Sequence, residues 1–178
     1  MKIGICGKIC SGKTTISNYL IDTHNFKKYS FGTAVKDLAK KFFGMDPNKK
    51  DRILLQTIGQ TCREILFPEV WIETTLRQIE RECTEFAVID DVRYLNEFDI
   101  LKRNGWIIIK IDISPELQIQ RIKDTYPDTY QQHLNNLEHI SEKEMDEIDL
   151  DKFDLVIDSN MELYEIYDTI QKINKSMS

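Results

Sequence analysis

The 178-residue chain predicts an α/β fold, a parallel sheet covered by helices on both faces, with a lid segment over about 122–140. Patterns of strand and helix alternate along the chain, and the predicted strands are mostly apolar, as in sheets buried on both sides. No internal repeat, low-complexity tract or Pro/Gly/Ser linker divides the sequence. Residues 1–178 are therefore expected to form a single domain.

Hydrophobic spacing separates one clear strand from several helices in the first half of the chain. Lys2–Cys6 is a short apolar run, whereas the apolar residues between 34 and 43 recur at helical spacing. Asp46 and Pro47 are expected to open a further helix. The expected elements are strands at Lys2–Cys6 and Lys28–Phe31, and helices at Thr14–His24, Ala34–Phe43, Pro47–Leu66 and Val70–Cys83.

In the second half, two buried strands and a cap motif organise the prediction. Ser114 and Pro115 mark a helix start, because serine caps the free N–H groups and proline suits the first turn. The expected strands are Phe86–Asp90, Trp106–Ile113 and Phe153–Ile157. The expected helices are Leu95–Arg103, stopped near Gly105, one from Ser114, and a closing helix striped by Leu163, Ile166, Tyr167, Ile170 and Ile173.

Composition and charge exclude several classes of function. No apolar run approaches the about 20 residues that cross a bilayer, so no membrane partner is expected. The net charge is −6, with +3 in residues 1–121 and −9 in residues 122–178, which does not suit a nucleic-acid binder. The four cysteines show neither metal-ligand nor disulfide spacing, so reduced thiols and a cytoplasmic location are expected. A homodimer is left open.

The strongest motif is Gly7–Thr14, which fits G-x-x-x-x-G-K-[ST] without a mismatch. Glycines let backbone N–H groups turn toward phosphate oxygens, and the helix that follows presents about half an elementary positive charge. Lys13 is expected to bridge the β- and γ-phosphates of ATP, and the Thr14 hydroxyl to bind Mg²⁺. The residues assigned to the nucleotide are Gly7, Lys8, Cys10, Ser11, Gly12, Lys13, Thr14, Thr15 and Arg121.

Two carboxylates end the strand that begins at Phe86. Asp90 is the expected acid behind the magnesium ion, and the alternative is a solvated turn in which an aspartate caps the next helix. Arg93 follows, and its planar guanidinium suits phosphoryl oxygens. Arg93 could equally form a surface ion pair with Asp91 or Glu97.

A polar stripe follows Pro47. Arg52, Gln56, Gly59 and Arg63 share one helix face, where a glycine costs about 1 kcal/mol against alanine. The stripe is either an exposed polar face or a seat for an acceptor's phosphate. Trp71 could stack on a base or belong to the core.

Arg121 precedes a polar stretch, Lys123–Glu138, which is expected to form the lid. At the base of this lid, Arg121 would stabilise the transferring phosphoryl group. The alternative is a surface loop with an exposed arginine.

Taken together, these residues resemble the bacteriophage and large-virus deoxynucleoside monophosphate kinases of the P-loop kinase superfamily. The resemblance covers most of the chain. It is carried by the phosphate loop, the Lys50-Asp51-Arg52-x-x-Leu55-Gln56-x-x-Gly59-x-x-x-Arg63 helix, Val70-Trp71, Ile89-Asp90-Asp91-Val92-Arg93-Tyr94-x-Asn96-Glu97, His139-x-Ser141-Glu142 and Phe153-Asp154-x-Val156-Ile157.

The resemblance implies transfer of the γ-phosphoryl group of ATP, with Mg²⁺, to a nucleoside monophosphate. It implies four catalytic residues, Lys13, Asp91, Arg93 and Arg121. It places Asp91, Arg93, Trp71 and Glu97 in the acceptor site, and Arg52 and Arg63 on the acceptor's phosphate. Lys36 and Gln56 complete the expected substrate residues, and Thr14 and Asp90 are the expected metal residues. The chain departs from the family pattern in having no arginine after Arg121 and in carrying Asp158-Ser159-Asn160-Met161 where a glycine-containing loop is expected.

Two other functions stay open on the sequence. One is a P-loop kinase of a different phosphorylated metabolite, such as a phosphorylated isoprenoid precursor or dephospho-coenzyme A. The other is a nucleotide-binding protein without catalysis.

Overall fold

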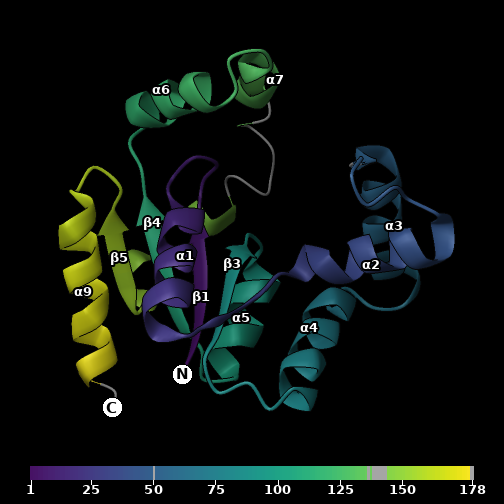
Figure 1. Ribbon diagram of the computed structural model, residues 1–178, viewed down its shortest axis with the longest axis horizontal. Helices are drawn as coiled ribbons and strands as arrows, with labels where there is room; N and C mark the ends of the chain where they lie inside the picture. The colour runs from purple at the N-terminus through teal and green to yellow at the C-terminus, as the bar shows by residue number, and fades with distance from the viewer. Residues whose placement is uncertain (50, 136, 138–143, 177–178) are drawn as a thin grey trace.

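A five-stranded parallel sheet forms the centre of the molecule (Figure 1). The computed structural model describes residues 1–178 except 50, 136, 138–143 and 177–178. In the order in which they pair, the strands are β2 (Lys27–Tyr29), β3 (Ala87–Val92), β1 (Lys2–Gly7), β4 (Ile107–Asp112) and β5 (Leu155–Asp158). Every pair is parallel, which confirms the predicted sheet. Because β1 lies in the middle, the loop that leaves it opens between β3 and β4.

Helices cover both faces of this sheet, as predicted (Figure 1). Apolar side chains of α1 and α9 pack with one set of strand residues, and those of α4 and α5 pack with the other. The helices are α1 (Lys13–His24), α2 (Phe31–Phe43), α3 (Arg52–Ile65), α4 (Val70–Arg81), α5 (Leu95–Arg103), α6 (Pro115–Thr125), α7 (Tyr130–Asn135) and α9 (Leu163–Ser176), with short 3₁₀ turns η1 (Glu144–Asp146) and η2 (Leu150–Lys152).

A third apolar cluster lies beside the sheet, where α2, α3 and α4 pack on one another. Its buried members include Val35 from α2, Ile58 from α3 and Trp71 from α4. Figure 1 shows α2 and α3 extending away from the sheet, whereas α6 and α7 lie at the end toward which the strands point. The fold therefore places two separate groups of helices around the carboxyl edge of the sheet.

The observed boundaries differ from the expected ones at most elements, and three of the differences lie near the predicted site. Phe31 is not in a strand but begins α2, where its N–H bonds to the side chain of Asp91. α3 begins at Arg52 rather than Pro47, because the Asp51 side chain accepts the Leu54 N–H and caps the helix. β3 continues past Asp90 to Val92, since these residues still lie within the sheet.

In the part of the chain that the structure describes, no helix combines the length and apolar character that a membrane span requires.

The start of α3 can be tested by comparing two aspartates. Asp51→Ala removes the cap and is expected to lower the free energy of unfolding by about 1 kcal/mol. Asp46→Ala breaks only the contact of Asp46 with the Asn48 N–H and should cost less. Urea denaturation measures both, and a larger loss for Asp46→Ala would place the helix start at Pro47 instead.

Candidate active site

The loop between β1 and α1 is shaped by two glycines with positive φ. Gly7 has φ +147° and Gly12 has φ +105°, conformations that residues with a side chain rarely adopt. A Cβ on Gly7 would lie 2.7 Å from the Ile111 carbonyl oxygen, so β4 allows no side chain there. A Cβ on Gly12 would meet nothing within 4 Å, which leaves open space at the N-terminus of α1.

The donor groups of this loop suit a phosphate chain. The Lys13 ammonium lies within the loop and donates to the carbonyl oxygens of Gly7 and Lys8, both at 2.6 Å. The Ser11 hydroxyl is buried and has no hydrogen-bond partner among the described residues. With the open space at Gly12, an ammonium and a helix N-terminus, the loop fits the phosphates of a nucleotide.

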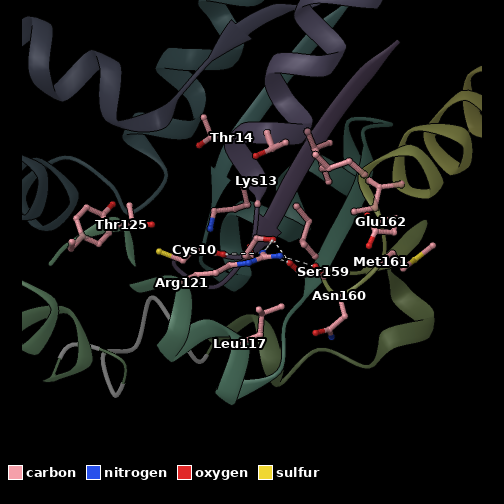
Figure 2. A pocket seen from close by; sticks show the side chains of 18 residues that line it. Cys10, Lys13, Thr14, Leu117, Arg121, Thr125, Ser159, Asn160, Met161 and Glu162 are labelled. Carbon is pink, nitrogen blue, oxygen red and sulfur yellow. Dashed lines mark hydrogen bonds between the residues drawn. The ribbon is translucent and has the colours of Figure 1, made fainter. Parts of the chain in front are cut away.

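A cavity of about 740 Å³ extends from this loop toward the segment after β5 (Figure 2). The residues Cys10 to Thr15 and Arg121, all predicted to bind the nucleotide, line it. The far wall is formed by Ser159 and the residues that lead into α9. The volume is in the range of small-molecule sites.

The outer side of the loop is held by donors from distant elements. Gln118 donates to the Ile9 carbonyl at 3.2 Å, and Arg121 donates to the Cys10 carbonyl at 3.3 Å. The Arg121 guanidinium also donates to the hydroxyl and the carbonyl of Ser159, at 2.6 and 2.9 Å (Figure 2). Arg121 thus contacts the loop backbone, and its action on a phosphoryl group stays a prediction.

Gly7 and Lys8 lie on the other side of the loop, next to a buried lysine. Asp146 of η1 bonds to Lys8 at 2.8 Å and to Lys110 of β4 at 3.1 Å. Burial raises the pKa of Asp146, but the hydrogen bonds from Lys8 and Lys110 outweigh it and hold the pKa below its ordinary value. The carboxylate is therefore charged and ties η1 to the loop.

Asp90 lies directly behind the first turn of α1. Its Oδ2 accepts the Ser17 hydroxyl at 2.9 Å and forms an ion pair with Lys28. Ser17 in turn reaches the Thr14 carbonyl at 3.1 Å. Ser17 thus connects the buried Asp90 carboxylate to the Thr14 backbone, and the role of Asp90 behind a Mg²⁺ ion bound at the Thr14 hydroxyl stays a prediction.

Among the described residues, the structure contains no metal site built from protein carboxylates alone. Within the described residues, no group of three or more His, Cys, Asp or Glu side chains could hold a metal ion. Mg²⁺ in nucleotide sites usually takes few protein ligands and relies on substrate phosphates and water. Thr14 and Asp90 therefore remain the predicted metal residues.

Asp91 points away from Asp90, because neighbouring residues of a strand face opposite sides. Its carboxylate accepts the Ser30 hydroxyl at 2.7 Å and the N–H groups of Phe31 and Gly32 at 3.2 and 3.3 Å. Asp91 thus occupies the N-terminus of α2, the position of a helix cap. The alternative of an aspartate that caps the next helix is therefore wrong, because Asp91 binds the start of a helix that precedes it by some 60 residues in the sequence.

Glu97 holds the backbone that carries Arg93. Its Oε2 accepts the N–H groups of Arg93 and Tyr94, at 2.7 and 3.1 Å. The side chain is 4% exposed, and burial raises its pKa from 4.5 to about 7 against the opposing effect of these N–H groups. Glu97 therefore shapes the turn in which Arg93 lies.

The polar stripe of α3 meets this turn through Arg63. The Arg63 guanidinium lies 5.8 Å from the centre of the Tyr94 ring and donates to the Gly59 carbonyl at 3.4 Å. The Trp71 indole N–H donates to the same carbonyl at 3.0 Å, and Trp71 is 6% exposed. The core alternative accounts for this tryptophan, and its contact with a base stays a prediction.

The structure gives no side-chain contact for three other predicted substrate residues, Lys36, Arg52 and Gln56. Lys36 and Gln56 are exposed on α2 and α3. Arg52 begins α3, but its side chain lies outside what the structure describes, as do His139, Ser141 and Glu142. In the predicted lid, the ring centres of Tyr126 and His133 stack 4.1 Å apart, and residues 136 and 138–140 lie outside the described residues.

Several residues of this site escaped sequence reasoning. Ser17 offered a signal, since it lies one helical turn after Thr14 and shares its face. Tyr94 and Ser159 were quoted only as parts of motifs and Asp146 not at all, because the partners that define their roles lie 31 or more positions away. Lys28 was expected only as part of a strand.

Comparison with known proteins gives two matches in sequence. A family model described as an AAA domain matches residues 3–148. A relative from Acanthamoeba polyphaga mimivirus, named "Putative deoxynucleotide monophosphate kinase", is 30% identical over 143 residues. That match covers 62% of this chain and 72% of the relative.

Solved structures share the fold at low sequence identity. Shikimate kinase from Aquifex aeolicus matches with a TM-score of 0.51 at 18% identity, covering 99% of this chain and 97% of that one. TT1252 from Thermus thermophilus matches with a TM-score of 0.62 at 13% identity, covering 100% and 98%. Both cover the whole sheet and its helices.

The raised pKa of Glu97 predicts a pH-dependent stability. Between pH 4.5 and about 7 the folded chain keeps a proton on Glu97 that the unfolded chain has released, so the free energy of unfolding falls as pH rises. Glu97→Gln cannot ionise and still offers an oxygen to both N–H groups. Between pH 5 and 8 the variant should lose less stability than the unmodified chain, by on the order of 2 kcal/mol.

Urea denaturation at both pH values measures this difference. The exposed Glu85→Gln is the control and should leave the pH dependence unchanged. Equal slopes for the Glu97→Gln variant and the unmodified chain would contradict a raised pKa for Glu97 in the folded chain.

Proposed function

This chain belongs to the AAA domain family and is a P-loop kinase, and we propose that it transfers the γ-phosphoryl group of ATP to the phosphate of a (deoxy)nucleoside monophosphate. The product would be the diphosphate. The observation that carries the proposal is the contact of Arg63 with Tyr94, which brings the polar stripe of α3 to the turn that holds Arg93. Two arginines from separate elements thus approach the same end of β3.

The donor half of the reaction rests on the loop and its cavity. Lys13 and the N-terminus of α1 would bind the β- and γ-phosphates, while the cavity beyond Ser159 takes the nucleoside. On binding, Lys13 would exchange the carbonyl oxygens of Gly7 and Lys8 for phosphate oxygens. When bound with ATP at Thr14, Mg²⁺ would supply charge neutralisation on the phosphates.

The acceptor half needs positioning more than acid–base chemistry. A nucleoside monophosphate already carries an ionised phosphate, so its oxygen attacks without a strong general base. Arg63 would hold this phosphate, and Arg93 would neutralise the group in transfer. Asp91 and Glu97 would contribute indirectly, because their carboxylates hold the start of α2 and the turn before α5 in place.

Supporting the acceptor class, the mimivirus relative is named as a deoxynucleotide monophosphate kinase. The arginines on the acceptor side suit a phosphate group. The similarity to shikimate kinase, at 18% identity, supports only the fold.

The direct test is ADP release from ATP and Mg²⁺ in the presence of each common nucleoside and deoxynucleoside monophosphate. Turnover is expected with at least one of them, and Lys13→Ala serves as the blank. If ATP binds but no nucleotide supports turnover, the proposal fails, and phosphorylated metabolites such as dephospho-coenzyme A become the acceptors to test.

Arg93→Ala should lower kcat at least hundredfold while ATP still binds, because an arginine on the transferring group contributes about 10³–10⁵ in rate. Kinetics with saturating acceptor and titration of ATP measure the two effects separately. The exposed Arg103→Ala, on the far end of α5, is the matched control and should keep its rate. A near-normal rate for Arg93→Ala would remove Arg93 from the reaction.

Tyr94→Leu is expected to raise the KM for the acceptor about three- to tenfold, because it removes the ring face against which Arg63 lies. The KM for ATP should not change. Tyr94→Phe keeps the ring and should restore the acceptor KM, which separates the cation–π contact from the hydroxyl. An equal rise in both variants would contradict this explanation.

A further inference from the structure

We infer that Ser159 is a positioning residue of the phosphate loop, which orients the Gly12 N–H toward the phosphates by holding the carbonyl of Ser11. The inference rests only on the phosphate-binding half of the proposed function and is independent of the acceptor.

The contacts of Ser159 connect three parts of the chain. Its hydroxyl donates to the Ser11 carbonyl at 2.6 Å and accepts from Arg121 Nη1 at 2.6 Å. Its own carbonyl accepts from Arg121 Nη2 at 2.9 Å, and its N–H donates to the Asp112 carbonyl at the end of β4 at 2.7 Å. The residue is 4% exposed, so these bonds form away from solvent.

These contacts fix the direction of the hydroxyl proton. A serine hydroxyl has one proton to donate, and the incoming Arg121 N–H occupies a lone pair. The proton is therefore donated to the Ser11 carbonyl oxygen. Arg121 Nη1 also donates to this oxygen, but from 3.5 Å away. Ser159 supplies the short bond to this carbonyl.

Holding the Ser11 carbonyl determines where the next N–H points. The peptide group is planar and trans, so the Gly12 N–H is directed opposite to the Ser11 carbonyl oxygen. The oxygen faces Ser159, and the N–H therefore faces the inside of the loop. Gly12 has φ +105° and open space where a Cβ would be, so an anion can approach this N–H.

Similar outward contacts occur along the loop. Gln118 holds the Ile9 carbonyl and Arg121 the Cys10 carbonyl, so the carbonyls of three consecutive residues are bonded on the outer side. Figure 2 shows Arg121 and Ser159 lying together against the loop from which Cys10 and Lys13 project. Ser159 differs from the other two donors because it lies in the segment after β5.

The experiment measures binding of inorganic triphosphate and of ATP by calorimetry, without an acceptor. Ser159→Ala should weaken both ligands by the same factor, about five- to twentyfold, because the loss lies in phosphate binding. Ser159→Thr keeps the hydroxyl and should restore both affinities. Thr169→Val removes a similar hydroxyl-to-carbonyl bond from α9, outside the cavity, and should change neither.

Unchanged triphosphate binding in Ser159→Ala would overturn the inference. Weaker binding of ATP alone would also overturn it, because Ser159 would then contact the nucleoside. Failure of Ser159→Thr to restore binding would be the third contrary result. If Ser159→Ala does not fold, as judged by circular dichroism, Ser159→Cys replaces it. A thiol is a weak donor, so an intermediate affinity is expected and an unchanged one overturns the inference. Failure of the unmodified chain to bind either ligand would overturn the donor half of the proposed function together with this inference.

Discussion

The parallel pairing of β1 between β3 and β4 is the constraint on which the site depends. Parallel strands end at the same edge of a sheet, so the phosphate loop after β1 emerges between the acidic end of β3 and the end of β4. In an order that separated these three strands, the polar residues that they carry would lie apart. Burial on both faces of the sheet keeps this arrangement rigid, because Ile3, Ile5 and Ile108 are almost fully enclosed.

The sequence predicted the sheet, most element positions and the phosphate loop, because these depend on local periodicity or on residues adjacent in the chain. It could not predict the contacts of Asp91, Trp71 and Arg63, whose partners are set by how α2, α3 and α4 pack. Asp91 illustrates the reason. A carboxylate at a strand end suits several roles, and only the approach of α2 shows that it accepts three bonds at that helix's N-terminus.

The two neighbouring aspartates show how one strand can serve two layers of the structure. Asp90 faces α1 and pairs with Lys28 and Ser17, whereas Asp91 faces the start of α2. The loop side and the acceptor side are therefore joined through a single dipeptide. A shift of β3 by one residue would exchange the two carboxylates and disturb both sides at once.

The contact of Lys110 with Asp146 has a consequence for how this chain can diverge in evolution. Lys110 is 5% exposed, and its ammonium is bonded to Asp146 and the Met145 carbonyl. Asp146 is partly exposed, but its loss alone would leave the buried Lys110 ammonium poorly compensated. A substitution at position 146 is therefore expected to depend on the residue at position 110, and Lys8, which shares the carboxylate, couples the phosphate loop to the same pair.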